Sequence, residues 1–597
     1  MTLTPLELLI SGLRAFIVVM FAMNVAVILT WADRRQGAAI QDRVGPNRAV
    51  AWIPTKVAQA LAVLPALGVV AGIVAFAFVA ARNLDAESRP FASVVFSQLA
   101  VFMWWLTGLV IAGRVVRRGP RSSFDVFVST LGNPRNFLYG GLVAHAVTLS
   151  LGLMYRGTEL GETLEQAGIS IGGALLALAV AFGAGYAAYS IRNEPRIGLR
   201  LAGLLHPAAD GLKTIFKEDF IPPNADKLLH SIAPIIAFFP ALVVLAVVPF
   251  GDSLCFGVDP ETGRSAFGEL FATVPATGCP GAQLPLQVVS LNVGVLYFFA
   301  LAGTGIVGAA LAGWASDNKF SLLGGLRAAS QMVSYEVTMG LTLIGAFMVY
   351  GTLRVDEMVR WQADNAWGIF LQPLAFVLFF AAAVAESKRI PFDLPEGESE
   401  IVAGYYTEYA GMKFAMFFFA EYIAVVTSSA LMAALFLGGW DLPFVERDGL
   451  HIALGNTVFF SAPLPHVFLV VIGALGFVFK TVLLCWVQLT IRWTLPRFRY
   501  DQLMRLGWRK LLPASLFNIV ITGLLVLAFQ SAGENVQRGL GVLADVTKLI
   551  VAVGGLVAFV SFVRFLLAPR NKRRLLATTS AQFAAALGGT RSARMEA

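Results

Sequence analysis

Apolar stretches of about twenty residues recur along this chain, and that is the length a helix needs to cross the hydrocarbon core of a bilayer. They begin at 8–31, 57–80, 94–113, 137–155 and 171–190. After a polar interval they continue at 231–250, 289–313, 331–350, 367–385, 414–436, 464–489, 512–531 and 544–567. We therefore expect an all-α polytopic membrane protein with about 13 transmembrane helices. The composition agrees, because 57% of the residues are hydrophobic and only 14% are charged, which leaves too little polar surface for several water-soluble domains.

The charged residues between these stretches predict which loops face the cytoplasm. The net charge is +8, and in membrane proteins such an excess of Lys and Arg gathers in cytoplasmic loops. The loops after the first, third and fifth stretches are basic, with Arg34, Arg35, Arg43 and Arg48; Arg114, Arg117, Arg118 and Arg121; and Arg192, Arg196, Arg200, Lys213 and Lys217. The loops at 157–168 and 251–285 are neutral or acidic. We expect an outside N-terminus, a cytoplasmic C-terminal tail and no nucleic-acid partner.

Few residues in the chain are suited to hold a redox cofactor or a metal. The three cysteines, Cys255, Cys279 and Cys485, are too few and too scattered for an iron–sulfur cluster or a structural zinc. Cys255 and Cys279 flank an outer loop, where a disulfide and two free thiols are both compatible with the sequence. No nucleotide-binding signature stands between a strand and a helix. We expect the chain to bind no metal, NAD, flavin or ATP of its own.

Ionisable side chains occur inside the apolar stretches. Glu336 lies about two turns into its stretch, Glu421 is placed similarly, and Lys480 falls in the middle. An ionised group in hydrocarbon costs at least ~2.5 kcal/mol, so its presence indicates a function by default. The alternative is that each belongs to a neutralised pair that only locks helices together. Because several such groups occur, we favour a proton relay, in which each group changes protonation at an accessible cost.

A second dense group of charges follows the stretch 367–385 on the basic side of the membrane. Its acidic residues are Glu386, Asp393, Glu396, Glu398, Glu400 and Glu408. A solvated loop would also be acidic, but this segment breaks the positive-inside trend and mixes tyrosines and prolines with its charges. We interpret it as an acidic funnel. Near the first stretch, Asp33 and Arg34 stand together at a helix end, where we favour a ligand-tunnel wall over a purely orienting charge.

Five blocks of the sequence together resemble one family. They are 33–48, 209–219, 312–337, 385–422 and 492–504. They resemble the H subunit of the proton-pumping NADH:quinone oxidoreductase, respiratory complex I, which is called subunit 1 in mitochondria. The resemblance covers residues 1 to about 50 and about 200 to 531. It implies a subunit of a bacterial cytoplasmic (inner) membrane that joins peripheral quinone-site subunits to membrane pump subunits, with quinone as substrate and with FMN and iron–sulfur clusters only in partner subunits.

The resemblance also implies roles for individual residues. The quinone tunnel would include Asp33, Arg34, Ala209, Asp210, Lys213, Phe216 and Glu218. The proton relay would include Glu336, Glu386, Glu396, Glu398, Glu400, Glu408, Glu421 and Lys480. A loop in contact with neighbouring subunits would include Arg492, Arg497, Arg499 and Asp501. Asp33 stands where the family usually has Glu, which keeps the charge on a shorter side chain.

Two segments depart from the family pattern. Residues 51–199, with four predicted spans, separate two halves of what is normally one cytoplasmic loop. Because four is even, both halves can stay on the cytoplasmic face. A further span near 544–567 takes the basic tail inside. We divide the chain into the first span with the start of the quinone-site loop (1–50), an inserted four-helix segment (51–199), the rest of an eight-span family core (200–531), and an extra span with its tail (532–597).

The expected function is that of an enzyme-complex subunit that helps to form the quinone tunnel and couples quinone reduction to proton translocation. The alternative is the related membrane subunit of a membrane-bound hydrogenase or of another complex that NADH does not feed, but blocks 33–48 and 492–504 favour the quinone enzyme over the hydrogenase. A secondary transporter would show matching halves with broken helices, and we recognise no such repeat. The sequence leaves open the electron donor and whether ubiquinone or menaquinone is reduced.

Overall fold

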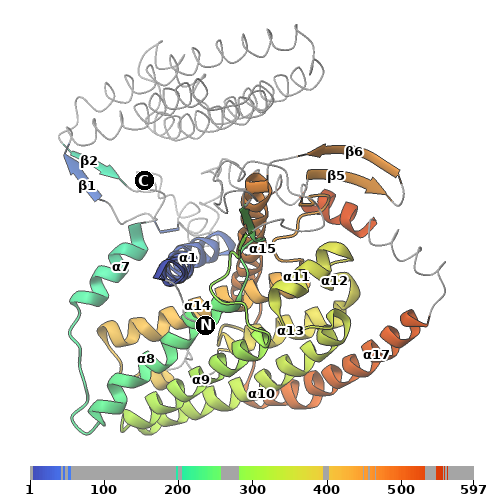
Figure 1. Cartoon of the computed structure of the whole chain (residues 1–597). Helices are drawn as coiled ribbons and strands as arrows, with labels where there is room; N and C mark the ends of the chain where they lie inside the picture. Colours follow the sequence, from blue (N-terminus) through green and yellow to red (C-terminus); the bar gives the residue numbers. More distant parts are fainter. Residues whose placement is uncertain are drawn as a thin grey trace, which may run out of the picture. The chain divides into compact units, whose positions relative to one another are not determined.

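The computed structural model describes residues 5–41, 45–46, 51–54, 196–199, 205–256, 282–393, 403–447, 449–454, 457–463, 466–531, 546–555, 557 and 561. The chain forms two compact units, one of residues 1–49, 202–559 and 577–597, and one of residues 50–201 and 560–576. The described part of the first unit is a bundle of long helices (Figure 1). In the second unit, β1 (Ala51–Pro54) pairs antiparallel with β2 (Arg196–Leu199), with Ala51 opposite Leu199.

Seven helices in the described part of the chain are long and apolar enough to span a membrane. They are built on α1 (Pro5–Ile40), α8 (Lys227–Val243), α9 (Gly294–Ala315), α10 (Lys319–Tyr350), α14 (Gly411–Phe436), α15 (His466–Thr494) and α17 (Leu512–Gln530). The shorter apolar helix α13 (Pro373–Glu386) occupies the predicted stretch 367–385. The all-α polytopic class is thereby confirmed. The predicted stretches 57–80, 94–113, 137–155 and 171–190 lie outside the described residues, and 544–567 is described only in part, by the apolar helix Val546–Gly555.

Short elements connect these spans. The helices among them are α7 (Leu205–Phe216), α11 (Val355–Asp364), α12 (Gly368–Leu371) and α16 (Tyr500–Leu506), with 3-10 turns at Val244–Val247 and Gly404–Tyr406 and a π-helical turn at Gly507–Leu511. Two antiparallel hairpins pair β3 (Leu254–Phe256) with β4 (Ala282–Leu284) and β5 (Gly449–Leu454) with β6 (Thr457–Pro463). Cys255 in β3 is disulfide-bonded, and its partner lies outside the described residues. Of the disulfide and the free thiol that the sequence left open, Cys255 therefore forms the disulfide.

Two helix boundaries differ from the predicted ones. α10 begins at Lys319 instead of 331, because the Asn318 side chain caps it by accepting a hydrogen bond of 2.9 Å from the amide of Phe320. Glu336 therefore lies near the middle of a 32-residue helix rather than two turns from its start. The stretch 367–385 is interrupted at Gln372, because Pro373 has no amide hydrogen to donate and begins a new helix.

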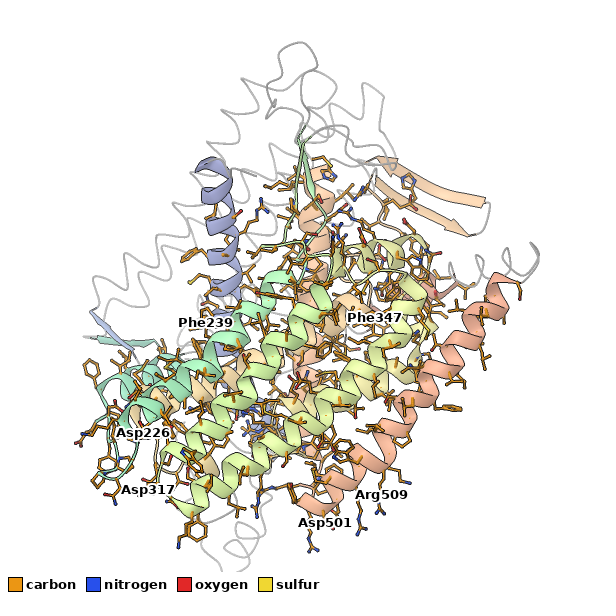
Figure 2. The ribbon with its side chains drawn as sticks, turned by 60° about the horizontal axis from the view of Figure 1, so that its bottom comes forward. Asp226, Phe239, Asp317, Phe347, Asp501 and Arg509 are labelled. Atoms are coloured by element: carbon orange, nitrogen blue, oxygen red, sulfur yellow. The ribbon has the colours of Figure 1, made fainter. Side chains whose placement is uncertain are left out.

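The bundle has a common polar end. The amide of Asp226 before α8 donates to the carbonyl of Ala315 at the end of α9, at 3.2 Å. Figure 2 shows Asp226, Asp317 and Asp501 at this end, with Phe239 and Phe347 further along the helices. Charged residues thus gather where α8, α10 and α16 begin and where α9 ends.

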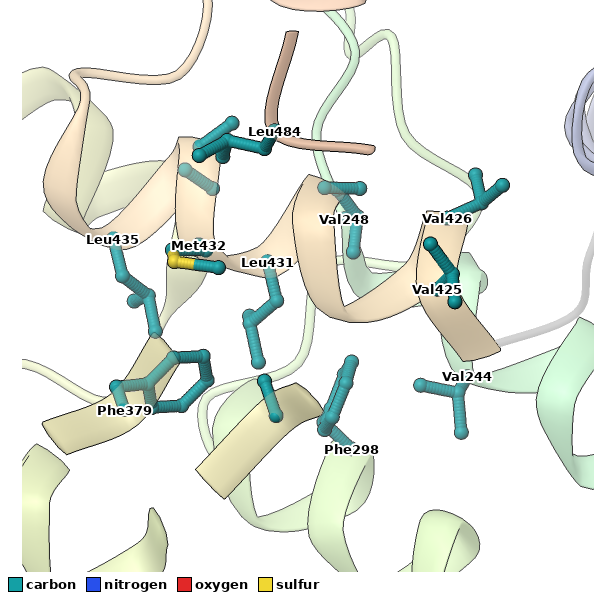
Figure 3. Packing of buried hydrophobic residues seen from close by; sticks show 14 of the residues in the cluster. Val244, Val248, Phe298, Phe379, Val425, Val426, Leu431, Met432, Leu435 and Leu484 are labelled. Carbon is teal, nitrogen blue, oxygen red and sulfur yellow. The ribbon is translucent and has the colours of Figure 1, made fainter. Parts of the chain in front are cut away.

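The core is built around α14. All residues from Ala430 to Phe436 are buried. Figure 3 shows Leu431 and Met432 of this helix packed among Phe379 of α13 and Leu484 of α15. Inside a bilayer, close van der Waals packing of this kind holds helices together, since lipid is as apolar as the side chains. The packing fixes α14 and with it the polar residues in its first half.

Two glycines bring the loop before α14 directly onto α10. A Cβ atom at Gly324 would lie 2.7 Å from the Cα of Gly404, closer than any side chain could approach. Gly404 has a φ of +54°, a conformation that favours glycine. The Ser321 hydroxyl donates to the carbonyl of Tyr405 at 3.4 Å. This contact sets the position of Tyr405 and of Tyr406 beside it.

Candidate functional site

Asp33 is a buried carboxylate that joins three helices. It lies in the last two turns of α1 and is only 4% exposed. Its Oδ2 accepts a hydrogen bond of 2.9 Å from the Tyr422 hydroxyl of α14 and forms an ion pair with Arg492 of α15. Its Oδ1 accepts from the indole Nε1 of Trp493 at 2.7 Å. With these partners its charge is compensated inside the bundle.

Arg389 links this group to a second buried carboxylate. The guanidinium carbon lies 4.0 Å from the centre of the Tyr422 ring, and Nη2 lies 3.4 Å from Oε2 of Glu421. Both members of this ion pair are buried. A buried charge is costly unless it is paired, so Arg389 and Glu421 depend on each other, and Arg389 also lies against the residue that binds Asp33.

A row of hydroxyl groups continues from Glu421 to Lys388. The Tyr406 hydroxyl donates to Oε1 of Glu421. The Tyr405 hydroxyl donates to that of Tyr406 at 2.7 Å, and Nζ of Lys388 donates to that of Tyr405 at 2.9 Å. A tyrosine hydroxyl can both donate and accept, so a proton displaced at one end of the row can be matched by a shift of hydrogen bonds along it.

The loop after α13 is held in place by α10. Gln331 of α10 is fully buried, and its Nε2 donates to the carbonyls of Ala385 and Phe392, at 2.7 and 2.8 Å. Lys388 adopts a φ of +55°, which turns the chain sharply after the helix end. The loop therefore presents Lys388 and Arg389 to the interior, where both are more than nine-tenths buried.

A cavity lies between α8, α9, α10, α13 and α14. Its volume is about 80 Å³, and Glu386, Lys388 and Glu421 are its charged lining residues. A water molecule needs at least ~10–15 Å³ of such volume, so several fit. The cavity thus places the end of the hydroxyl row and the predicted relay residue Glu386 around one space that can hold water.

Glu336 lies beside this cavity against α9. A Cβ atom at Gly303 would come within 2.9 Å of Oε1 of Glu336, so the absence of a side chain at 303 makes room for the carboxylate. Glu336 and Glu386 are near enough for their charges to repel one another.

Asp393, another predicted funnel residue, is buried and only 5% exposed. The remaining predicted funnel residues fall into two groups. Glu408 accepts a hydrogen bond of 2.7 Å from Nδ2 of Asn318, and its backbone carbonyl lies 3.3 Å from Nε2 of His230. The ring of His230 stacks on Tyr409 at 4.0 Å. Glu396, Glu398 and Glu400 lie outside the described residues.

The predicted tunnel residues gather on α7 and at the end of α1. Nη2 of Arg34 forms an ion pair of 2.6 Å with Oδ2 of Asp210, and both side chains are about half exposed. Ala209, Lys213, Phe216 and Glu218 are exposed, and α7 has no buried residue. Asp33 and Arg34 therefore point to different neighbours, Asp33 into the bundle and Arg34 toward α7.

The predicted subunit-contact residues differ in their surroundings. Arg492 is turned into the bundle, where it pairs with Asp33. Arg499 and Asp501 stand at the start of α16 with their side chains 81% and 54% exposed, while Arg497 makes interactions within the chain. Of this group, Arg499 and Asp501 have the exposure that a contact with another subunit requires.

Lys480 occupies a separate place, at the far end of α14. Its ammonium group donates to the backbone carbonyls of Leu437 and Gly439, at 2.7 and 3.0 Å, and to that of Asp441. It also lies 4.0 Å from the centre of the Trp367 ring. Burial raises the pKa of Asp441. The charge of nearby Lys480 and a hydrogen bond from Trp367 act in the opposite direction and lower it. From Glu421 to Leu437 the helix rises about 24 Å, so Lys480 is not part of the Glu421 group.

Sequence reasoning missed Arg389 and Tyr422, which hold the two buried carboxylates together. Both lie inside the block 385–422, but neither was selected. A usable signal existed, because each intramembrane carboxylate needs a cation and Lys388 and Arg389 directly follow Glu386. The choice of partner, however, depends on which helices pack together.

Known proteins match the part of the chain that carries this group of residues. A family model described as NADH dehydrogenase matches residues 173–523. The H 1 subunit of the NADH-quinone oxidoreductase of Cytophaga hutchinsonii is 43% identical over 352 residues, 58% of this chain and 92% of the relative. The H 2 subunit of the Geobacter metallireducens enzyme is 46% identical over 324 residues, 54% of this chain and 83% of the relative. The H 1 subunit of the Geobacter sulfurreducens enzyme is 45% identical over 335 residues, 54% of this chain and 82% of the relative.

Proposed function

This chain belongs to the NADH dehydrogenase family together with bacterial NADH-quinone oxidoreductase H subunits, and we propose that it couples quinone reduction to proton translocation. It is a multi-pass membrane subunit of that enzyme complex, whose substrate is quinone. The observation that carries the coupling role is the series of contacts from Asp33 through Tyr422 and Arg389 to Glu421, which the hydroxyls of Tyr406 and Tyr405 continue to Lys388. One end adjoins Arg34 and α7, and the other lines the cavity.

The quinone tunnel runs along α7 and the end of α1. The exposed apolar side chains of α7 beside the Arg34–Asp210 pair support this proposal, since sites for largely apolar ligands combine an apolar wall with a few polar groups. The predicted residues Ala209, Lys213, Phe216 and Glu218 complete this wall. Peripheral partner subunits close the tunnel and hold the FMN and iron–sulfur clusters that supply electrons.

Coupling begins with a change of charge at the inner end of the tunnel, beside Arg34 and Asp33. Quinone reduction draws protons and changes the charge near Arg34 and Asp33. Asp33 binds the hydroxyl of Tyr422, and Arg389 lies on the ring of Tyr422 while pairing with Glu421. At these distances in a low-dielectric interior, a change at Asp33 alters the attraction of Arg389 for Glu421. Glu421 then gains or releases a proton through Tyr406.

The cavity connects this step to the other carboxylates. Water in it would join Glu421 to Glu386, and the repulsion between Glu386 and Glu336 favours sharing one proton between them. Glu396, Glu398, Glu400 and Glu408 supply protons from the cytoplasmic side. Lys480 remains a predicted relay member, but its hydrogen bonds to three carbonyls favour a structural role.

The chain is oriented in the bacterial cytoplasmic membrane with its N-terminus outside and its C-terminus in the cytoplasm. We propose that residues 51–199, most of which lie outside the described residues, cross the membrane an even number of times. The pairing of Ala51 with Leu199 supports this division, because it brings both ends of the segment together. Residues 1–50 and 200–531 form the family core, and 532–597 an extra span with its tail.

The test is Glu421→Gln in the assembled complex, reconstituted in vesicles with NADH and quinone. Gln keeps the size of the side chain but removes the charge that pairs with Arg389, so activity is measured per amount of assembled complex. Proton translocation and coupled quinone reduction should fall by at least about a hundredfold, the size of effect expected for a lost proton-transfer group. The matched control is Glu357→Gln. The Glu357 carboxylate also pairs with an arginine, Arg354, but it is not part of the series of contacts between Asp33 and Lys388. Normal turnover and translocation in assembled Glu421→Gln complex would refute the proposal.

A further inference from the structure

A short rigid platform lies where the chain enters α17. The hydroxyl of Tyr335 on α10 donates to the carbonyl of Leu503 at 3.0 Å. The indole Nε1 of Trp508 donates to Oγ of Ser334, also at 3.0 Å. Together these contacts hold α16 and the π-helical turn Gly507–Leu511 against α10, so the side chains on their opposite face have defined positions.

That opposite face carries three exposed cations within six residues, Arg505, Arg509 and Lys510. Leu503 and Gly507 are the buried positions toward α10, and successive helical residues turn by ~100°, which directs Arg505 and Arg509 away from it. None of the three cations has an ion-pair partner among the described residues. Figure 2 shows Arg509 at the polar end of the bundle.

An exposed apolar face begins directly beyond these cations. On α17, Leu516, Phe517, Val520, Leu524 and Leu527 are 47–64% exposed. Trp508 lies at the junction of the two surfaces, 47% exposed. An indole with its N–H bound and its ring half exposed is characteristic of the boundary between hydrocarbon and headgroups.

We propose that Arg505, Arg509 and Lys510 bind the phosphate of an anionic phospholipid whose acyl chains lie along the exposed face of α17. Guanidinium groups bind phosphate through paired hydrogen bonds, and an ammonium adds a further charge. The unpaired positive charges select a lipid with net negative charge over a zwitterionic one. The continuous order of cations, indole and apolar side chains matches a lipid along its whole length. An acidic segment of another subunit would match only the cations.

The experiment uses the whole complex, reconstituted in vesicles that contain photoactivatable phosphatidylglycerol or photoactivatable phosphatidylcholine, each with its reactive group on an acyl chain. Labelled peptides of this chain are then identified by mass spectrometry. Phosphatidylglycerol should label 516–527 several-fold more than phosphatidylcholine does. In Arg505→Gln/Arg509→Gln the two lipids should label 516–527 nearly equally, because each cation near the membrane surface contributes about 1 kcal/mol of attraction for an anionic lipid.

The matched control is Lys227→Gln/Lys319→Gln, which removes the same number of exposed charges from the same end of the bundle. It should keep the wild-type preference at 516–527. Equal labelling by the two lipids, or an unchanged preference in the arginine variant, would overturn the proposal. Amine-reactive crosslinking of Lys510 to another subunit, with no lipid labelling of 516–527, would also overturn it and assign the surface to a protein partner.

Discussion

The hydroxyl of Tyr422 lies 2.9 Å from Oδ2 of Asp33, although the two residues are 389 positions apart in the sequence. This hydrogen bond joins the end of α1 to α14. The guanidinium carbon of Arg389 lies 4.0 Å from the centre of the Tyr422 ring. Tyr422 thus contacts both Asp33, which adjoins Arg34 and α7, and Arg389, which pairs with Glu421 beside the cavity.

Asp33→Asn tests the junction between α1, α14 and α15. The amide is nearly isosteric but leaves Arg492 without its charge partner, and breaking one side of a buried pair costs about 3–5 kcal/mol. We expect less assembled complex in the membrane and a lower midpoint temperature of unfolding, measured on purified complex. Asp33→Glu keeps the charge and should restore most of the loss. Equal stability of the Asn and Glu variants would contradict the role given to this ion pair.

Gly303→Ala tests the space in which Glu336 lies. The added methyl group would approach Oε1 of Glu336 to 2.9 Å and displace the carboxylate. We expect intact assembly and slower proton translocation, measured with a pH-sensitive dye in vesicles. Gly340→Ala is the control, because it is on the same helix as Glu336 and its methyl group would meet no atom within 4 Å. If both variants pump at the wild-type rate, the position of Glu336 has no bearing on translocation.

Lys480→Met separates a structural lysine from a relay lysine. The substitution leaves the carbonyls of Leu437, Gly439 and Asp441 without their donor, and each unsatisfied buried group costs about 1–3 kcal/mol. We expect a markedly lower thermal stability but an unchanged number of protons moved per electron in the complex that does assemble. Lys319→Met, at an exposed position, should change neither quantity. Normal stability with lost pumping would instead support the relay role predicted from the sequence.

Cysteine labelling tests the topology of residues 51–199. Single cysteines at 48 and 213, in an otherwise cysteine-free and active variant, should react with an impermeant maleimide from the same side of the membrane. The antiparallel pairing of β1 with β2 is the reason, since it holds the two ends of the segment next to each other. Labelling from opposite sides would reject an even number of crossings.

Much of the fold followed from residue type and spacing. Apolar stretches of spanning length have few alternatives to a transmembrane helix, because backbone groups in lipid must bond within the segment. For the same reason Glu336, Glu421 and Lys480 could be singled out, since a charge in hydrocarbon is costly wherever it occurs. The boundaries were less accessible. α10 starts at the Asn318 cap and α13 starts at Pro373. Both are local signals, and the average hydropathy from which the stretches were predicted does not include them.

The sequence alone determined that this chain crosses a membrane many times, that it carries unusual buried charges, and which family it resembles. Only the tertiary structure decided how those charges are partnered. In the folded bundle Arg492 pairs with Asp33, and Arg389 contacts both Tyr422 and Glu421. Lys480 lies apart from them, at the far end of α14. The physical reason is that the cost of burying a charge depends on its residue type, whereas its compensation depends on distances of a few ångströms between helices remote in sequence.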